Sequence, residues 1–192
     1  MYAIYRGDLN IVKILLDKRD IDVNLQRVSG YTALMDAITK EYIDIVRILL
    51  NKADIDVNIQ NDEGDTALIY AIHKGYIDIV KILLDKIDIN VNIQNNVGYT
   101  ALMNAINKGY IDIVRILLNN ESININQQAI SGSSALMNAI HNKNYKIVEM
   151  LLDAGVDINL KDSQNLTALD YLNTLCEREP VHELCTLRKR LI

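Results

Sequence analysis

The hydrophobic positions of the chain recur with helical spacing and then recur again as a block. Leu34, Ala37 and Ile38 are three and four residues apart, which places them on one face of a short helix. The block at residues 45–50 is apolar at almost every position and covers most of a second helix. The pattern therefore predicts pairs of short helices, and the second helix of each pair needs stacked neighbours to bury it.

Both blocks return along the chain at a constant interval. Gly-x-Thr-Ala-Leu or a close variant begins at residues 30, 64, 98 and 132, at a spacing of 34, and a fifth copy begins at Asn165 after 33. Ile-Val-x-Ile-Leu-Leu or its variant occupies residues 11–16, 45–50, 79–84, 113–118 and 147–152. The period predicts a truncated first repeat, four full repeats and a C-terminal cap, at roughly 1–29, 30–63, 64–97, 98–131, 132–164 and 165–192.

Turn and capping residues fit the same repeat. A hydroxyl residue directly precedes each Ala-Leu pair and is expected to accept a hydrogen bond from the first turn of the helix: Thr32, Thr66, Thr100, Ser134 and Thr167. Glycines two residues earlier and at the ends of helices are expected to have positive φ. Asn165 takes the place of one of them, and Glu41 and Lys143 occupy helix-closing positions held elsewhere by glycine. We therefore expect positive φ at Glu41 and Lys143, or a differently shaped turn.

Together these segments, with Gly-Tyr-x-Asp-Ile-Val and Asp-Val-Asn, resemble the ankyrin repeat over the entire chain. The resemblance implies a single all-α domain over residues 1–192, a solenoid of helix-turn-helix units with projecting hairpin-like loops. It also places an asparagine in each loop, where a structural role is favoured over hydroxylation by an asparaginyl hydroxylase: Asn24, Asn58, Asn92, Asn126 and Asn159. The chain departs from the family in having Ala where Pro usually follows the Thr, and Met or Ile where His is usual. It also carries one extra residue at the junctions after most second helices, and we expect that residue to replace a left-handed glycine such as Gly155.

The first and last repeats differ from the others. The first begins at Ala3, inside a helix, which fits either a short native N-terminus or, as we favour, a fragment of a longer array. In the last repeat Pro180 is expected in a first turn and Arg188–Arg190 near a helix end, which is typical of a polar cap.

Composition and charge narrow the function. Hydrophobic residues make up 49% of the chain, which suffices for a core, and the net charge of -5 argues against general nucleic-acid binding. No apolar run suggests a membrane span or secretion signal. Cys176 and Cys185 are a sparse pair that gives little support for a disulfide, so we expect buried cap cysteines in a soluble, intracellular and monomeric protein.

One basic residue near the end of each first helix forms a candidate binding row, which comprises Arg6, Lys40, Lys74 and Lys108. Such a row would attract an acidic peptide or loop, with His73 and His141 beside it on the concave face that the resemblance implies. The alternative is an ordinary solvated helix end, because Lys is favourable there in any case.

The loop tips supply a second set of candidate partner-binding residues: Tyr31, Asp62, Glu63, Asp65, Val97, Tyr99 and Ser133. Tyr is enriched among the residues that dominate binding energy at interfaces. For Tyr31 and Tyr99 the alternative is packing between adjacent hairpins.

No residues point to catalysis or to a cofactor. Cys176, His182 and Cys185 do not have the spacing of a zinc site, and no phosphate-binding or nucleophile motif is present. The sequence thus favours a non-catalytic protein-protein interaction module. Two alternatives stay open, namely a regulatory or targeting segment of a larger enzyme or effector, and a structural spacer.

Overall fold

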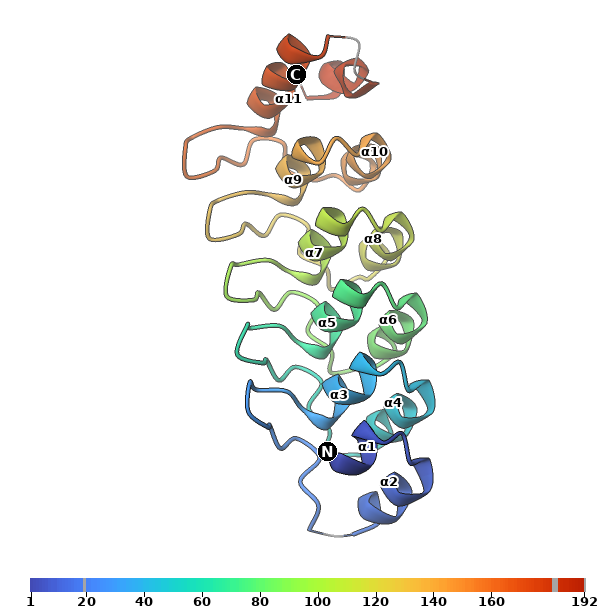
Figure 1. The fold of residues 1–192 in the computed structure, drawn as a ribbon. Helices are drawn as coiled ribbons and strands as arrows, with labels where there is room; N and C mark the ends of the chain where they lie inside the picture. Colours follow the sequence, from blue (N-terminus) through green and yellow to red (C-terminus); the bar gives the residue numbers. More distant parts are fainter. Residues whose placement is uncertain (19, 181–182, 192) are drawn as a thin grey trace. The chain divides into compact units, whose positions relative to one another are not determined.

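The computed structural model describes residues 1–18, 20–180 and 183–191, and within these ranges the chain forms helices and no strand. It divides into two compact units, Met1–Asn96 and Val97–Ile192. In each unit, helices pair side by side and long loops project on one side of the first helices (Figure 1). The predicted all-α class of stacked helix-turn-helix units is confirmed, while the assignment of residues 1–192 to one domain stays a prediction.

Each full repeat supplies one helix pair. The first unit contains α1 (Tyr2–Tyr5), α2 (Leu9–Leu16), α3 (Ala33–Thr39), α4 (Ile43–Leu50), α5 (Ala67–Lys74) and α6 (Ile77–Leu84). The second contains α7 (Ala101–Lys108), α8 (Ile111–Leu118), α9 (Ala135–His141), α10 (Tyr145–Asp153), α11 (Ala168–Arg178) and the 3₁₀ helix η1 (Glu183–Arg190).

The first helices begin where the hydroxyl residues predict. The side chain of Thr32 accepts a hydrogen bond from the Met35 amide at 3.3 Å, and Ser134 does the same for Met137. These bonds satisfy amides that have no partner within the helix. Equivalent caps start α5, α7 and α11, so all five predicted N-caps are confirmed.

The core lies between the helices of successive pairs within each unit. Leu34, Ala37 and Ile38 on α3 are almost fully buried, as the spacing predicts. On α4, Ile45 and Leu49 are equally buried, which agrees with a second helix covered on several sides. Burial of the equivalent side chains in the full repeats provides the main stabilisation of the stack.

Left-handed backbone closes the first helices. Gly75 follows α5 with φ 74°, and Glu41 and Lys143 take φ 57° and 55° at the equivalent positions. The predicted positive φ of these two non-glycine residues is therefore confirmed. Asn165 also has the expected positive φ, and Ser29, with φ 75°, adds a position that the sequence did not suggest.

The exits from the second helices follow the predicted rule. After α10 the chain leaves through Gly155 at φ 76°. After α4, α6 and α8 the capping residue is right-handed, and no described residue of these longer junctions has positive φ. One extra residue thus replaces the left-handed glycine.

The loop asparagines connect successive repeats. Asn24 donates from Nδ2 to the Asp54 carbonyl at 2.7 Å and accepts at Oδ1 from the Asp56 amide at 2.8 Å. Asn58 makes the same pair of bonds to Asp88 and Asn90. Since these contacts satisfy backbone groups of the next loop, the structural role predicted for the loop asparagines is confirmed for Asn24 and Asn58.

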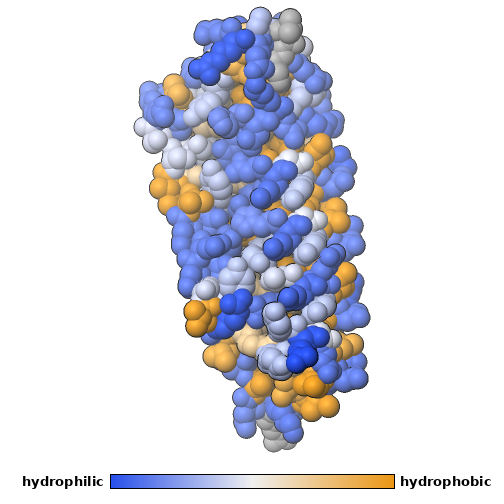
Figure 2. Space-filling model, in the orientation of Figure 1, coloured by the Kyte–Doolittle hydropathy of each residue, from blue (hydrophilic) through white to orange (hydrophobic). Residues whose placement is uncertain are grey.

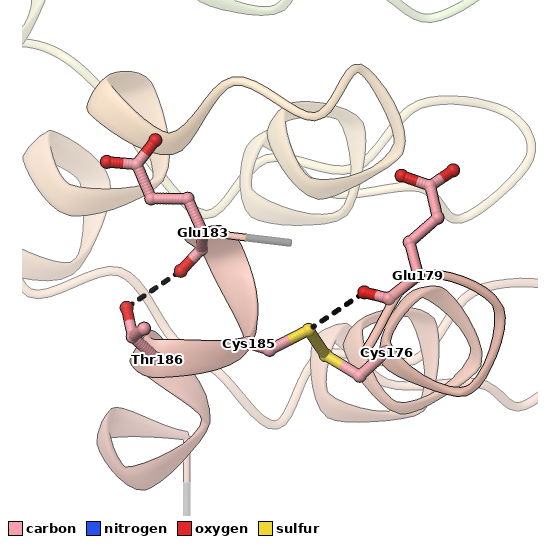
Figure 3. The surroundings of a disulfide bond; sticks show 5 residues. All are labelled: Cys176, Glu179, Glu183, Cys185 and Thr186. Carbon is pink, nitrogen blue, oxygen red and sulfur yellow. Dashed lines mark hydrogen bonds between the residues drawn. A yellow bond between two sulfur atoms is a disulfide. The ribbon is translucent and has the colours of Figure 1, made fainter. Parts of the chain in front are cut away.

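The C-terminal cap corrects one expectation. Cys176 on α11 and Cys185 on η1 are half-buried and form a disulfide bond (Figure 3), so the prediction of buried, unpaired cap cysteines is wrong. The expected intracellular location stays a prediction. Pro180 lies in a turn, and residues 181–182 between it and η1 lie outside the described residues, so its expected first-turn position also stays a prediction. The basic residues Arg188–Arg190 do lie in the last turn, as predicted.

The N-terminal end of the first unit exposes apolar side chains, visible as a group of hydrophobic residues beside a largely hydrophilic face (Figure 2). Ile11 and Ile14 on α2 are 47% and 60% exposed. Ile45 on α4, which corresponds to Ile11 in the next repeat, is only 2% exposed, because α2 packs against α4.

Candidate functional site

Three residues of the predicted basic row lie at the ends of the first helices of the first unit. Arg6 caps α1, Lys40 caps α3 and Lys74 is the last residue of α5. All three side chains are exposed to solvent. The equivalence of their positions follows from the repeat, whereas contact with a partner stays a prediction.

These side chains form cation–π contacts with tyrosine rings. The Lys40 ammonium is 4.4 Å from the centroid of Tyr5, a residue of α1, the first helix of the preceding repeat. The Arg6 guanidinium carbon is 5.4 Å from the centroid of Tyr2, and Arg6 also donates hydrogen bonds to the Tyr2 hydroxyl. Each exposed cation–π contact contributes about 0.5–1 kcal/mol and reduces the freedom of the long side chain.

A second group of tyrosines continues this surface across α3 and α5. The rings of Tyr31 and Tyr70 meet edge to face, with centroids 5.3 Å apart. The Lys74 ammonium lies 5.4 Å from the Tyr70 centroid, and the Tyr70 and Thr39 hydroxyls are hydrogen-bonded at 3.3 Å. Partial burial, and then the neighbouring Tyr70, raise the pKa of Tyr31 to about 12. Tyr31 thus packs between neighbouring repeats and also borders the surface.

Arg27 completes the group from the loop before α3. Its guanidinium carbon is 4.6 Å from the Tyr31 centroid, and its Nη2 is 3.0 Å from Asp36 Oδ1. The hydrogen bond to Asp36 raises the pKa of Arg27. We call the resulting surface the tyrosine–cation face. It comprises Tyr2, Tyr5, Arg6, Arg27, Tyr31, Lys40, Tyr70 and Lys74.

Asp65 does not act as a tip residue. Its side chain is only 1% exposed, so the prediction that it contacts a partner is wrong. One carboxylate oxygen lies 3.2 Å from Nδ1 of His73, and the other accepts a hydrogen bond from Asn95 at 2.9 Å. Asp65 therefore fixes the orientation of His73, which is 29% exposed beside Lys74.

The other tip residues differ in accessibility. Asp62, Glu63 and Val97 are exposed, while Tyr99 and Ser133 are half-buried. In the second unit Lys108 and His141 are exposed. Around them the second unit carries asparagines, and Asn142 donates to Asn107 at 3.1 Å. Partner binding by these residues stays a prediction.

Sequence reasoning overlooked Tyr2, Arg27, Asp36 and Tyr70. A signal for three of them was available, because Tyr2, Asp36 and Tyr70 precede Arg6, Lys40 and Lys74 by four residues and so share their helix face. No signal predicted that Tyr31 would meet Tyr70, because they belong to different repeats.

The described residues contain no group of three or more His, Cys, Asp or Glu side chains placed to hold a metal ion. His182 lies outside the described residues, and Cys176 and Cys185 are bonded to each other. Among the described helices, none combines the length and apolar character needed to cross a membrane.

Comparison with known proteins places these repeats in a family. The model of ankyrin repeats in three copies matches residues 1–95 and 87–162. A crystal structure of the ankyrin repeat protein EF0377 is 31% identical, with a TM-score of 0.82, over 93% of this chain and 92% of that chain. An ankyrin repeat domain of Acinetobacter baumannii is 29% identical, with a TM-score of 0.84, over 99% and 94%.

A third similar structure contains two proteins. It is the predatory endopeptidase Bd0816 from Bdellovibrio bacteriovorus in complex with the immunity protein Bd3460, in which one chain is 31% identical to this protein. That match has a TM-score of 0.71 and covers 92% of this chain and 91% of the other. A comparison with curated protein sequences found no significant match.

Proposed function

The chain belongs to the ankyrin repeat family, and we propose that it binds a partner protein through the tyrosine–cation face of its first unit. Ankyrin repeats are generally protein-interaction modules. The observation that carries the proposal is the placement of Arg6, Lys40 and Lys74 on tyrosine rings at equivalent helix ends.

The chemistry of this face suits recognition. Tyr and Arg are the side chains most enriched at the energetic centres of interfaces, since they combine apolar area with polar groups. Here their rings and cations already contact each other, so binding would restrict few additional rotamers. Because these side chains are already held in place, their arrangement favours a role in binding over a role in solubility alone.

Charge favours an acidic partner segment. The protein as a whole carries a net charge of -5, yet this face presents Arg6, Lys40 and Lys74 with one neutralising pair, Arg27–Asp36. A local positive surface on an acidic protein would orient an acidic peptide or loop toward it. The similarity to a chain of an endopeptidase–immunity protein complex supports a protein as the partner.

A pair of matched charge reversals tests the proposal. Lys40→Glu with Lys74→Glu alters the face. Lys13→Glu with Lys81→Glu makes the same change in net charge at exposed positions on the second helices α2 and α6. Binding is measured by fluorescence anisotropy with labelled peptides of equal length whose charged residues are Glu, Gln or Lys.

We expect the wild type and the second-helix variant to prefer the Glu peptides. The face variant should bind them about tenfold or more weakly, because each lost charge-assisted contact costs ~1 kcal/mol or more. Equal binding of Glu and Gln peptides by the wild type, or equal losses in both variants, would refute an acidic partner on this face.

A further inference from the structure

The second unit contains a groove that no sequence feature suggested. It has a volume of about 440 Å3 and lies between α9 and α11, with the loop before α11 along its edge. Ile140, His141 and Lys143 form one side, and Tyr171, Leu175 and Arg178 form the other. Clefts of about 300–1,000 Å3 are typical of sites that hold a ligand.

The groove exists because α11 is longer than the other first helices. α9 ends at His141 and is followed by Lys143 with a left-handed backbone, whereas Cys176 stands at the equivalent place in α11 and has no positive φ. The helix therefore runs on to Arg178. An ion pair between Lys143 Nζ and Glu179 Oε1 joins this extra turn to the α9–α10 turn.

The floor of the groove is apolar and one wall is fixed. Ile140 is buried, and Leu166 and Leu175 are partly accessible beside it. Tyr171 donates a hydrogen bond from its hydroxyl to Asp162 Oδ2 at 2.6 Å, which holds the ring in place. The same bond raises the pKa of Tyr171 and lowers that of Asp162.

The rim carries hydrogen-bond donors and the cation Arg178. Arg178 and His141 are exposed on opposite sides of the groove, and within the described part of the chain neither forms an ion pair or hydrogen bond through its side chain. Lys143 is already paired with Glu179, so the carboxylate present at the rim is neutralised. The groove thus combines an apolar floor with donors for an anionic group, and guanidinium is especially suited to carboxylate.

We propose that this groove binds an extended peptide segment in which an apolar side chain lies next to a carboxylate. The apolar side chain would lie over Leu166 and Leu175, and the carboxylate would meet Arg178 and His141. The groove lies entirely within the second unit, so the inference stands independently of the tyrosine–cation face.

Selection from a displayed library of random peptides tests this inference and requires no identified partner. The bait carries Lys40→Glu and Lys74→Glu, which removes the first-unit contribution. Two further baits add either His141→Glu with Arg178→Glu, or Leu166→Asp at the partly exposed edge of the floor. A fourth adds Lys108→Glu with Lys146→Glu on exposed positions of the same unit, as a control that makes the protein at least as acidic as the rim variant. Circular dichroism verifies that every bait is folded.

We expect the first and fourth baits to enrich peptides with Leu, Ile, Phe or Tyr beside Asp or Glu. The rim variant should lose the acidic preference, and the edge variant the apolar one. A selected peptide should bind the rim variant about tenfold or more weakly, and Arg178→Lys should restore part of that loss. The absence of enrichment with the first bait, or enrichment that persists in the rim variant, would overturn the inference whatever the first-unit face does.

Discussion

Single residues determine where the chain can turn and where repeats approach each other. Gly98 and Gly155 both have left-handed backbone, with φ 80° and 76°. A Cβ added at Gly98 would lie 2.4 Å from the Ile130 amide nitrogen, whereas a Cβ at Gly155 would meet nothing within 4 Å. Both positions would place a side chain on left-handed backbone, but only Gly98 would also bring it into a steric clash. A comparison of the two therefore separates backbone strain from steric exclusion.

Replacement of these two glycines by alanine should have unequal effects. Gly155→Ala should lower the free energy of unfolding by about 1 kcal/mol, the cost of left-handed geometry for an L-residue. Gly98→Ala should lower it by about 3 kcal/mol or more, since the hairpin must also shift away from the Ile130 backbone. Urea denaturation followed by circular dichroism measures both, and equal losses would contradict the steric account.

Glu41 offers the reverse test. It holds φ 57° at a helix-closing position, so Glu41→Gly should raise the free energy of unfolding by about 0.5–1 kcal/mol. Glu41→Ala keeps the strain and removes the same charge, so it serves as the control. Both variants are compared by urea denaturation, and a gain in the alanine variant as large as in the glycine variant would show that charge, not backbone geometry, is responsible.

At the scale of elements, the C-terminal cap differs most from the repeats before it. α11 continues past the place where the other first helices close, and the disulfide between Cys176 and Cys185 ties it to η1. η1 buries Leu184 and Leu187, so the bond keeps apolar cover on the end of the second unit. A cross-link stabilises chiefly by restricting the unfolded chain.

Loss of this bond should weaken the second unit. For a loop of about 10 residues, Cys185→Ser or reduction with dithiothreitol should lower the free energy of unfolding by about 2–3 kcal/mol. The variant with both cysteines changed to serine provides the control, because reductant should not affect it further. An identical unfolding curve of the wild type with and without reductant would show that the cap is held by packing alone.

The loop before α11 should respond to acid. Asp162 accepts the Tyr171 hydroxyl and the amides of Gln164 and Leu166, and these bonds hold its pKa below the usual range. A lowered pKa adds stability above the ordinary value of about 4, and this stability is lost as the pH falls through the folded-state value. Asp162→Asn should therefore melt at a lower temperature than wild type at neutral pH.

The difference between the two proteins should shrink as the pH falls below the ordinary carboxyl pKa of about 4 and through the lowered folded-state pKa, because the wild-type carboxylate then also becomes protonated. Differential scanning calorimetry over this pH range provides the measurement. A melting difference that stays constant with pH would assign the effect to packing and not to charge.

These elements also mark what sequence can predict. The helix starts at Thr32 and Ser134 and the left-handed Glu41 follow from local chemistry within one repeat, so they were predictable. The burial of Asp65 and the contact of Tyr31 with Tyr70 depend on how one repeat meets the next. The groove beside α11 depends on the continuation of this helix past Cys176, where the other first helices end. No residue pattern in the sequence predicted that continuation.

At the scale of the molecule, the two units present different chemistry to a partner. The first carries tyrosine rings under Arg6, Lys40 and Lys74, and the second carries asparagines and the groove near His141 and Arg178. The basic position recurs along the repeats as Arg6, Lys40, Lys74 and Lys108, whereas the tyrosine rings beside it occur in the first unit and the groove in the second. Specificity should therefore reside in the residues that the repeat does not need for folding.

The most direct test of the central proposal is a quantitative pull-down from cell lysate with mass spectrometry. It compares the wild type, the Lys40→Glu/Lys74→Glu variant and the Lys13→Glu/Lys81→Glu variant, each verified as folded by circular dichroism. We predict proteins with acidic segments that the wild type and the second-helix variant retain and the face variant loses. Retention of the same proteins by all three would contradict partner binding through the tyrosine–cation face.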